Sequence, residues 1–186
     1  GHCVAVKVGD QTVQGATLII ATGMEHRTLN LPREDEYQKR GVHYCATCDG
    51  PVYTGKRVAV VGGGDAAVKS ANQLVDMGAE HVYLVVREDN MDRAEPINRD
   101  RLEQKIADGS VTVLYENEIT SYTGGPPLEG VTLASAHDGS TALDVAAVFI
   151  EIGSVPRVEL AKQLGVALTE RGEINVEAET MKTNID

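Results

Sequence analysis

A glycine-rich turn between a predicted strand and a predicted helix constrains the fold of this 186-residue chain more than any other feature. Residues 58–61 form a short apolar run typical of a buried strand, and residues 62–67 follow the pattern Gly-x-Gly-x-x-Ala. Apolar side chains then recur at helical spacing as far as Val75, and Gly78 ends the helix. A second apolar strand follows at residues 82–86. The segment therefore predicts a β-α-β unit of a parallel sheet.

The remaining pattern predicts an α/β fold, namely a three-layer Rossmann-like domain with a parallel sheet and an antiparallel insertion. After the β-α-β unit we expect a helix at 98–107, a loop at 124–127, and strands at 111–115, 131–136 and 146–152. Outside this region we expect strands within residues 3–22, the last at 17–20, an amphipathic segment at 158–164 and a strand near Ile174. Residues 30–40 are rich in charge, contain Pro32 and lack an apolar period, so we interpret them as a linker.

The glycine-rich turn also predicts a dinucleotide site. Gly62 allows the tight turn, Gly64 lets the backbone approach a pyrophosphate, and the small Ala67 lets the helix and strand pack closely. The free N–H groups at the start of the helix would face the anion. The candidate cofactor-binding residues of the turn are Gly62, Gly63, Gly64, Asp65, Ala66 and Ala67. A glycine-rich turn without a ligand is the alternative.

The end of the second strand carries acidic and basic residues that favour different nicotinamide cofactors. Glu88, 21 positions after Ala67, favours NADH because a carboxylate there accepts from the ribose 2′-hydroxyl. Arg87 and Arg93 favour NADPH because guanidinium groups pair with a 2′-phosphate. In a third interpretation all three are solvated loop charges. We predict NADH over NADPH, since Glu88 would repel the phosphate.

Two cysteines, Cys45 and Cys48, are separated by two residues, a spacing that suits a reversible disulfide better than a structural crosslink. Half of a zinc site is the alternative, with His43, His26 or Cys3 as further ligands, but none of these supplies a second matching pair. We therefore predict no metal. Asp49 is placed to relay a proton to these thiols, or else serves as a helix-start carboxylate.

Composition excludes several classes of protein. The chain has 17 Lys and Arg against 28 Asp and Glu, so its net charge of −11 disfavours nucleic acid as a partner. The longest apolar run is about six residues, short of the roughly 20 that cross a membrane. With three Cys, the chain is not a secreted disulfide scaffold, and we expect a cytoplasmic protein.

The residues from Tyr44 to Gly50, followed by residues 56–65, resemble the central part of the low-molecular-weight thioredoxin reductases. These are flavoproteins of the pyridine nucleotide-disulfide oxidoreductase class. The resemblance continues over nearly the whole chain, through residues 20–27, 150–153 with Pro156, and 181–184. In this family the Cys-Ala-Thr-Cys-Asp-Gly motif stands at the same distance ahead of the glycine-rich turn.

The resemblance implies a thioredoxin-disulfide reductase in which NADH or NADPH reduces FAD, FAD reduces the Cys45–Cys48 disulfide, and the dithiol reduces thioredoxin or a related small disulfide protein. By position, Cys48 would face the flavin, Cys45 would attack the partner and Asp49 would be the acid-base residue. Ala21, Thr22 and Gly23, where the chain leaves the flavin domain, would also be cofactor-binding residues. The family also implies a homodimer.

Two departures from the family pattern shape our expectations. The family's first flavin fingerprint and its terminal Gly-Asp segment are absent, so we expect an internal fragment that binds no stoichiometric FAD. The predicted domains are 1–29 (partial FAD-binding), 30–152 (NAD(P)-binding, with the cysteine pair) and 153–186 (partial FAD-binding). The His-Arg-Arg of NADPH-using members reads Val86-Arg87-Glu88 here.

Three other functions remain open. An NADH-dependent flavoprotein that serves a peroxide-reducing system resembles this family closely. A reductase fed by another electron donor is the second. A non-catalytic nicotinamide-binding module is the third, but such a module has no use for Cys45 and Cys48.

Overall fold

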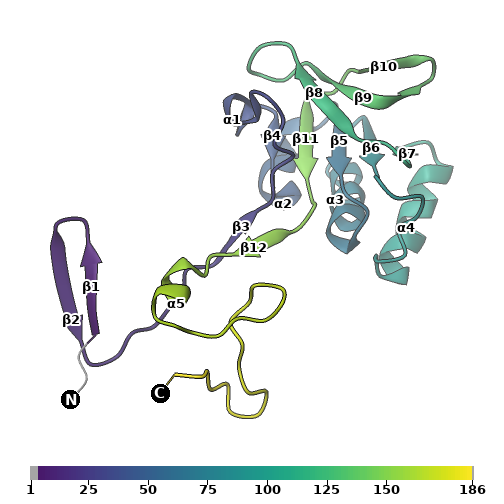
Figure 1. Cartoon of the computed structure of the whole chain (residues 1–186). Coiled ribbons are helices and arrows are strands. Elements are labelled where there is room, and N and C mark those ends of the chain that lie inside the picture. The colour runs from purple at the N-terminus through teal and green to yellow at the C-terminus, as the bar shows by residue number, and fades with distance from the viewer. Residues whose placement is uncertain (1–3, 186) are drawn as a thin grey trace. The chain divides into compact units, whose positions relative to one another are not determined.

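A computed structural model describes residues 4–185 and divides them into two compact units (Figure 1). One unit runs from His26 to Gly153, and the other combines the described residues up to Glu25 with those from Ser154 onward. The units divide after residues 25 and 153, whereas the predicted boundaries follow residues 29 and 152. The larger unit contains the glycine-rich turn and both cysteines of the pair.

A five-stranded parallel sheet forms the centre of the larger unit, in the order β4-β11-β5-β6-β7. Its strands are β4 (Val42–His43), β5 (Arg57–Val61), β6 (His81–Val85), β7 (Val111–Leu114) and β11 (Ala147–Ile150). The helices α3 (Asp65–Asp76) and α4 (Pro96–Ala107) pack on one face. The antiparallel strands β8 (Ile119–Thr123), β9 (Gly130–His137) and β10 (Ser140–Leu143) cover the other.

Alternate side chains of β5 explain why this sheet has helices on one side and a second sheet on the other. Val58 and Val60 enter the core beneath α3 and α4, whereas Ala59 and Val61 enter the core beneath β8–β10. All four are buried, as expected for a parallel strand covered on both faces. The α/β class, the parallel sheet and the antiparallel insertion are thus confirmed.

The stretch at residues 30–40 is not the simple linker we predicted. It contains a four-residue helix, α1 (Glu34–Tyr37), and the Tyr37 ring is fully buried. The Tyr37 hydroxyl donates to the carbonyl of Gly124 over 2.6 Å, and the buried Glu34 carboxylate accepts from the N–H groups of Leu29 and Leu31. These contacts are made by single residues and produce no apolar periodicity, so the sequence pattern could not predict them.

The second unit contains a hairpin of β1 (Val4–Val8) and β2 (Gln11–Gly15), and α5 (Glu159–Gln163). It also contains a short pairing of β3 (Met24–His26) with β12 (Ser154–Pro156), except for the last residue of β3, His26, which belongs to the larger unit. Two predicted strands were wrong. Within the described residues no strand pairs with 17–20, and Ile19 is 88% exposed. Near Ile174 there is only an isolated bridge to Leu168. Residues that favour β-structure form a strand only where an adjacent strand can exchange backbone hydrogen bonds with them.

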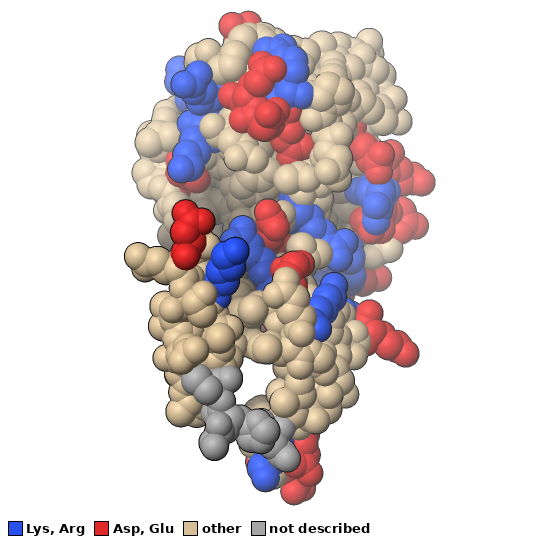
Figure 2. Space-filling view, turned by 60° about the vertical axis from the view of Figure 1, so that its left-hand side comes forward, with Lys and Arg blue, Asp and Glu red and all other residues tan. Residues whose placement is uncertain are grey.

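The helices of the described chain are too short to cross a bilayer. The longest, α3 and α4, have 12 residues each. A spanning helix needs roughly 20. On the face drawn in Figure 2, Lys and Arg side chains lie among Asp and Glu side chains.

Candidate functional site

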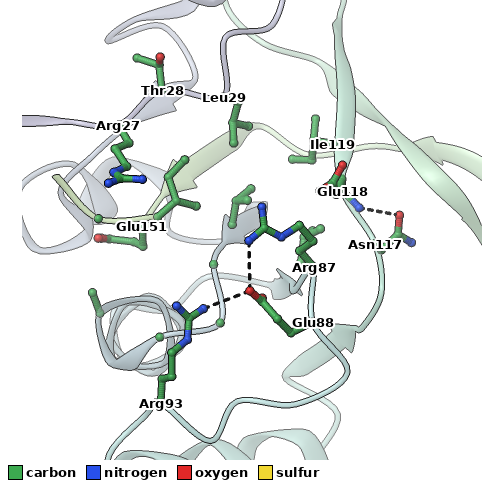
Figure 3. Close-up of a pocket in the computed structure, with 18 of the residues that line it drawn as sticks. Arg27, Thr28, Leu29, Arg87, Glu88, Arg93, Asn117, Glu118, Ile119 and Glu151 are labelled. Carbon is green, nitrogen blue, oxygen red and sulfur yellow. Dashed lines mark hydrogen bonds and ion pairs between the residues drawn. The ribbon is translucent and has the colours of Figure 1, made fainter. Parts of the chain in front are cut away.

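A cleft of about 780 Å³ opens in the larger unit at the carboxyl ends of β5, β6 and β11 (Figure 3). The glycine-rich turn forms part of its wall. The end of β6, the start of β8 and residues 151–153 form other parts. In open α/β sheets this edge is where ligands bind. The cleft is therefore the candidate nucleotide site.

The three glycines of the turn differ in what a side chain would contact at each position. Gly62 has φ of +141°, and a Cβ there would collide with the carbonyl oxygen of Glu151. At Gly63 a Cβ would lie 2.8 Å from Cγ1 of Val86. Gly64 is the N-cap of α3, and a Cβ there would meet no atom within 4 Å. The backbone at Gly64 is thus open to a ligand, while Gly62 and Gly63 pack against the protein.

The start of α3 is available to an anion. The N–H groups of Asp65, Ala66 and Ala67 have no partner within the helix, and no side chain caps them at Gly64. A pyrophosphate would accept from such groups. The residues present therefore fit the phosphate part of a nicotinamide dinucleotide.

Asp65, predicted to bind the cofactor, directs its carboxylate to α4 instead. Oδ1 accepts from the N–H of Glu95 at 2.9 Å and from the amide of Asn98 at 2.8 Å, and Oδ2 lies 2.7 Å from Nζ of Lys69. The Lys69 hydrogen bond, with those of Glu95 and Asn98, lowers the pKa of Asp65 to about 2. The carboxylate thus joins the starts of two helices, a role that the sequence pattern did not reveal. Asp65 and Ala66 still line the cleft, and Ala67 is buried beneath it.

The structure brings together the three charged residues predicted to choose the cofactor. The guanidinium groups of Arg87 and Arg93 each lie 3.3 Å from the same atom, Oε1 of Glu88 (Figure 3). The backbone N–H of Glu88 and then the two arginines lower the pKa of this carboxyl. The arginine side chains are 74% and 71% exposed, so these ion pairs are weak. A ligand at the cleft would therefore meet a carboxylate held between two cations.

Glu151 is a cleft residue that the sequence pattern did not predict as part of a site. It follows β11 directly, and Oε1 accepts a hydrogen bond from Oγ of the buried Ser70 at 2.7 Å. Burial raises the pKa of the Glu151 carboxyl. A charged residue within the apolar run of residues 148–152 was the signal that could have revealed it. Arg27 lines the same cleft (Figure 3).

Cys45 and Cys48 form a disulfide in the structure. They lie at the beginning of α2 (Ala46–Asp49), where the Cys45 sulfur accepts from the N–H of Cys48 at 3.2 Å. A helix of one turn thus follows Cys45. Cys3, one of the alternative zinc ligands, lies outside the described residues.

His43, another alternative zinc ligand, contacts Asp49 and Tyr53. Its Nδ1 lies 3.1 Å from Oδ2 of Asp49, and its Nε2 lies 2.7 Å from the Tyr53 hydroxyl. Burial, and then the charge of Asp49, raise the pKa of Tyr53. The sequence did not predict that Asp49 shares a contact with His43, because the two residues meet only when β4 and α2 are folded.

Ala21, Thr22 and Gly23, predicted to lie near a flavin, belong to the second unit. The Thr22 hydroxyl donates to the carbonyl of Arg157 at 2.5 Å, and the N–H of Arg157 donates to the carbonyl of Gly23 at 3.0 Å. These contacts extend the pairing of β3 with β12. Within the described residues of this unit, the chain has no glycine-rich turn from a strand into a helix of the kind that holds a dinucleotide. The residues present do not complete a flavin site.

The fold, the cleft and the cysteine pair define a class of protein. Residues 2–186 match the family model described as pyridine nucleotide-disulphide oxidoreductase, and the chain belongs to this family. The predicted resemblance is thereby confirmed at the level of the family.

Individual relatives refine this assignment. The chain is 38% identical over 187 residues to a thioredoxin reductase of Mycolicibacterium smegmatis, covering 100% of this chain and 58% of that protein. It is 36% identical over 169 residues to an alkyl hydroperoxide reductase component of Xanthomonas campestris pv. phaseoli, covering 89% of this chain and 31% of that protein. The crystal structure of Lactococcus lactis thioredoxin reductase in the FR conformation matches with a TM-score of 0.80 at 30% identity, covering 100% of this chain and 59% of that one. The chain thus spans little more than half the length of the thioredoxin reductases it matches.

Proposed function

We propose that this chain is the nicotinamide-binding and disulfide-bearing part of a thioredoxin reductase. Reducing equivalents would pass from NADH through FAD to the Cys45–Cys48 disulfide and on to thioredoxin or a related small disulfide protein. The observation that carries the proposal is the Cys45–Cys48 disulfide, which lies in the same compact unit as a cleft fit for a dinucleotide. The names of the relatives support it.

The chain's own residues have separate tasks in this reaction. The N–H groups at the start of α3 would bind the pyrophosphate, and Glu88 would accept from the ribose 2′-hydroxyl. FAD, when bound by the full-length protein, supplies the two-electron relay between nicotinamide and disulfide. In exchange with the partner, the Cys45 thiolate attacks a partner sulfur to form a mixed disulfide, and Cys48 then attacks Cys45 and releases the partner dithiol. Asp49 exchanges protons with these sulfurs.

The test of this function uses the full-length protein loaded with FAD. We expect it to oxidise NADH when thioredoxin disulfide is the acceptor, because it would contain both the nucleotide site that receives electrons and the cysteine pair that passes them on. Consumption of NADH is followed by its absorbance. Failure to reduce any thioredoxin, with retained oxidation of NADH by an artificial electron acceptor, would contradict the proposed partner.

One second function has a specific observation in its favour. The similarity to a component of an alkyl hydroperoxide reductase, together with Glu88 in the cofactor cleft, supports an NADH-dependent reductase of a peroxide-reducing system. The same disulfide would then pass electrons to that system. Supplying either thioredoxin or the peroxide-reducing partner as the sole acceptor separates the two functions. A module that only binds nicotinamide would not need the disulfide.

Cofactor choice provides a prediction from the charge cluster. A 2′-phosphate would have to displace Glu88 from two arginines, and even a screened repulsion costs on the order of 1 kcal/mol, or about fivefold in affinity. We therefore expect NADH to bind more tightly than NADPH. Glu88→Gln should free both arginines, and Glu88→Arg should shift the preference further toward NADPH. Titration of the chain with both nucleotides at one salt concentration measures the ratio.

The matched control for this prediction is Glu80→Gln. Glu80 is an exposed carboxylate just before β6, whereas Glu88 follows that strand, so the substitution removes the same charge at the opposite end. We expect the nucleotide ratio to stay unchanged. Binding of NADPH tenfold tighter than NADH by the unmutated chain would contradict the role of Glu88.

Flavin content provides a separate prediction. Because the second unit lacks a dinucleotide turn within the described residues, the purified 186-residue chain should contain no stoichiometric FAD. The visible absorption spectrum of the protein, compared with its peptide absorbance, measures the content. A yellow protein with close to one FAD per chain would show that the flavin is held in another way.

A further inference from the structure

The buried imidazole of His43 lies next to the residue that the proposed function uses for proton exchange. We propose that His43 is a positioning residue for Asp49: it holds one carboxylate oxygen so that the other can exchange protons with Cys45 and Cys48. The inference rests on the proposed thiol-disulfide exchange. The sequence motifs around the cysteines contain no signal for it, since they indicate His43 only as a metal ligand.

The contacts of His43 bear on which of its ring nitrogens carries a hydrogen. Nδ1 lies 3.1 Å from Oδ2 of Asp49, at an angle outside that of a regular hydrogen bond, and among the described residues it has no hydrogen-bond partner. Because a carboxylate can only accept, a hydrogen on Nδ1 is what makes this contact favourable. In the neutral ring Nε2 is then an acceptor, and the Tyr53 hydroxyl, 2.7 Å away, is its donor. The Tyr53 hydroxyl is thus compatible with the tautomer of His43 that carries its hydrogen on the side of Asp49. The titratable groups in contact with the ring are Asp49 and Tyr53.

The packing around His43 fixes the ring. The residue is 5% exposed, and its ring stacks on Phe149 with centroids 5.3 Å apart. The Tyr53 ring meets both rings edge-on, at 5.3 Å from His43 and 5.9 Å from Phe149. His43 and Phe149 are register partners on the neighbouring parallel strands β4 and β11. The ring is thus held on one side by the sheet, through Phe149, and on the other by Tyr53, which follows the segment that carries the disulfide.

Asp49 connects this buried ring to the cysteines. It follows Cys48 directly in α2, and its side chain is 42% exposed. Among the described contacts of its carboxylate, only Oδ2 is engaged, by His43. Oδ1 is therefore left for proton exchange. A carboxylate fixed at one oxygen loses less orientational freedom when it acts, which is the usual benefit of a positioned acid-base group.

The exchange step balances with Asp49 in this role. The dithiol loses two electrons and two protons as Cys45 and Cys48 join, and the partner disulfide gains both as its sulfurs leave as thiols. Asp49 takes a proton from a cysteine thiol and gives it to a departing sulfur, so the carboxylate ends as it began.

The test follows the exchange reaction in the 186-residue chain. The reduced protein is mixed with glutathione disulfide, and the cysteines that remain reduced are measured by acid quenching, alkylation and mass spectrometry. We expect His43→Leu to slow oxidation of the Cys45 and Cys48 pair about tenfold, a fraction of the full effect of an acid-base group. Asp49→Asn should slow it at least as much. The double variant should be no slower than Asp49→Asn, because His43 acts only through Asp49.

Two further variants separate positioning from packing. His43→Asn retains a donor at the place of Nδ1 and should remain within about threefold of the unmutated rate. His43→Gln places its amide further along the side chain, toward Tyr53, and should be as slow as His43→Leu. These two variants carry the test if His43→Leu does not fold. Retained binding of NADH in the separate cleft reports on folding.

The matched control is His81→Leu. His81 lies on β6 of the same sheet, half-buried, with its Nε2 2.9 Å from the Thr112 hydroxyl. Its loss should leave the exchange rate unchanged. Equal rates for His43→Leu and the unmutated chain, or equal rates for the Asn and Gln variants, would overturn the proposal, as would slowing in the double variant equal to the product of the single effects. An unmutated dithiol that reacts no faster than free glutathione would instead overturn the proposed function itself.

Discussion

Replacing Cys48 with Ser should abolish reduction of protein disulfides by the FAD-loaded full-length protein while leaving reduction of the flavin by nicotinamide intact. A single remaining thiol can form a mixed disulfide but cannot resolve it. The nicotinamide cleft does not include either cysteine, so hydride transfer should not depend on Cys48. Stopped-flow measurements with NADH and with dithiothreitol report the two half-reactions separately.

The control for this experiment is Thr47→Ser. Thr47 stands between the cysteines, and its hydroxyl donates to the side-chain carbonyl of Gln73 at 3.1 Å, a contact that Ser can keep. We expect its turnover to match that of the unmutated protein. Sustained turnover of a protein disulfide by Cys48→Ser would show that electrons leave by a route other than the Cys45–Cys48 pair.

Replacing Gly62 with Ala should destabilise the chain by about 3 kcal/mol, among the larger effects of a single methyl group. The new Cβ would collide with the backbone carbonyl of Glu151, which directly follows β11, and the φ of +141° is strained for any residue with a side chain. A backbone atom cannot move aside without disturbing the sheet. Urea-induced unfolding, followed by circular dichroism, measures the loss.

Gly64→Ala is the matched comparison, because its Cβ would meet no protein atom within 4 Å. Here the free energy of unfolding should change by about 1 kcal/mol or less, the ordinary range for an N-cap. Binding of NADH should nevertheless weaken, since the new methyl would occupy the space through which a pyrophosphate approaches the backbone. If Gly64→Ala binds NADH as tightly as the unmutated chain, the pyrophosphate does not lie at this turn.

The charged residues Arg87, Glu88 and Arg93 show which features of the site could be predicted from the sequence. The position of Arg87 and Glu88 at the end of a predicted strand was enough to predict them as candidate residues for the choice between NADH and NADPH. The sequence did not predict how these side chains are arranged, because Arg93 reaches Oε1 of Glu88 from the loop that follows the strand. The sequence left open whether the two arginines converge. In the structure they do, on a carboxylate of the protein itself.

The sequence by itself determined the features that depend on neighbouring residues. The β-α-β unit follows from apolar periodicity, the turn from the spacing of Gly62 and Gly64, and the disulfide from the two residues between Cys45 and Cys48. In each case the interacting groups are a few residues apart, so local geometry decides the outcome.

Only the tertiary structure decided the contacts between distant segments. Phe149 supports the His43 ring because β11 inserts between β4 and β5, a strand order that periodicity does not specify. Residues 17–20 favour a strand by their residue types, but within the described chain no neighbouring strand pairs with them, so they form none. Local pattern sets which residues can form a strand or a turn, whereas the order in which strands pair sets which side chains meet.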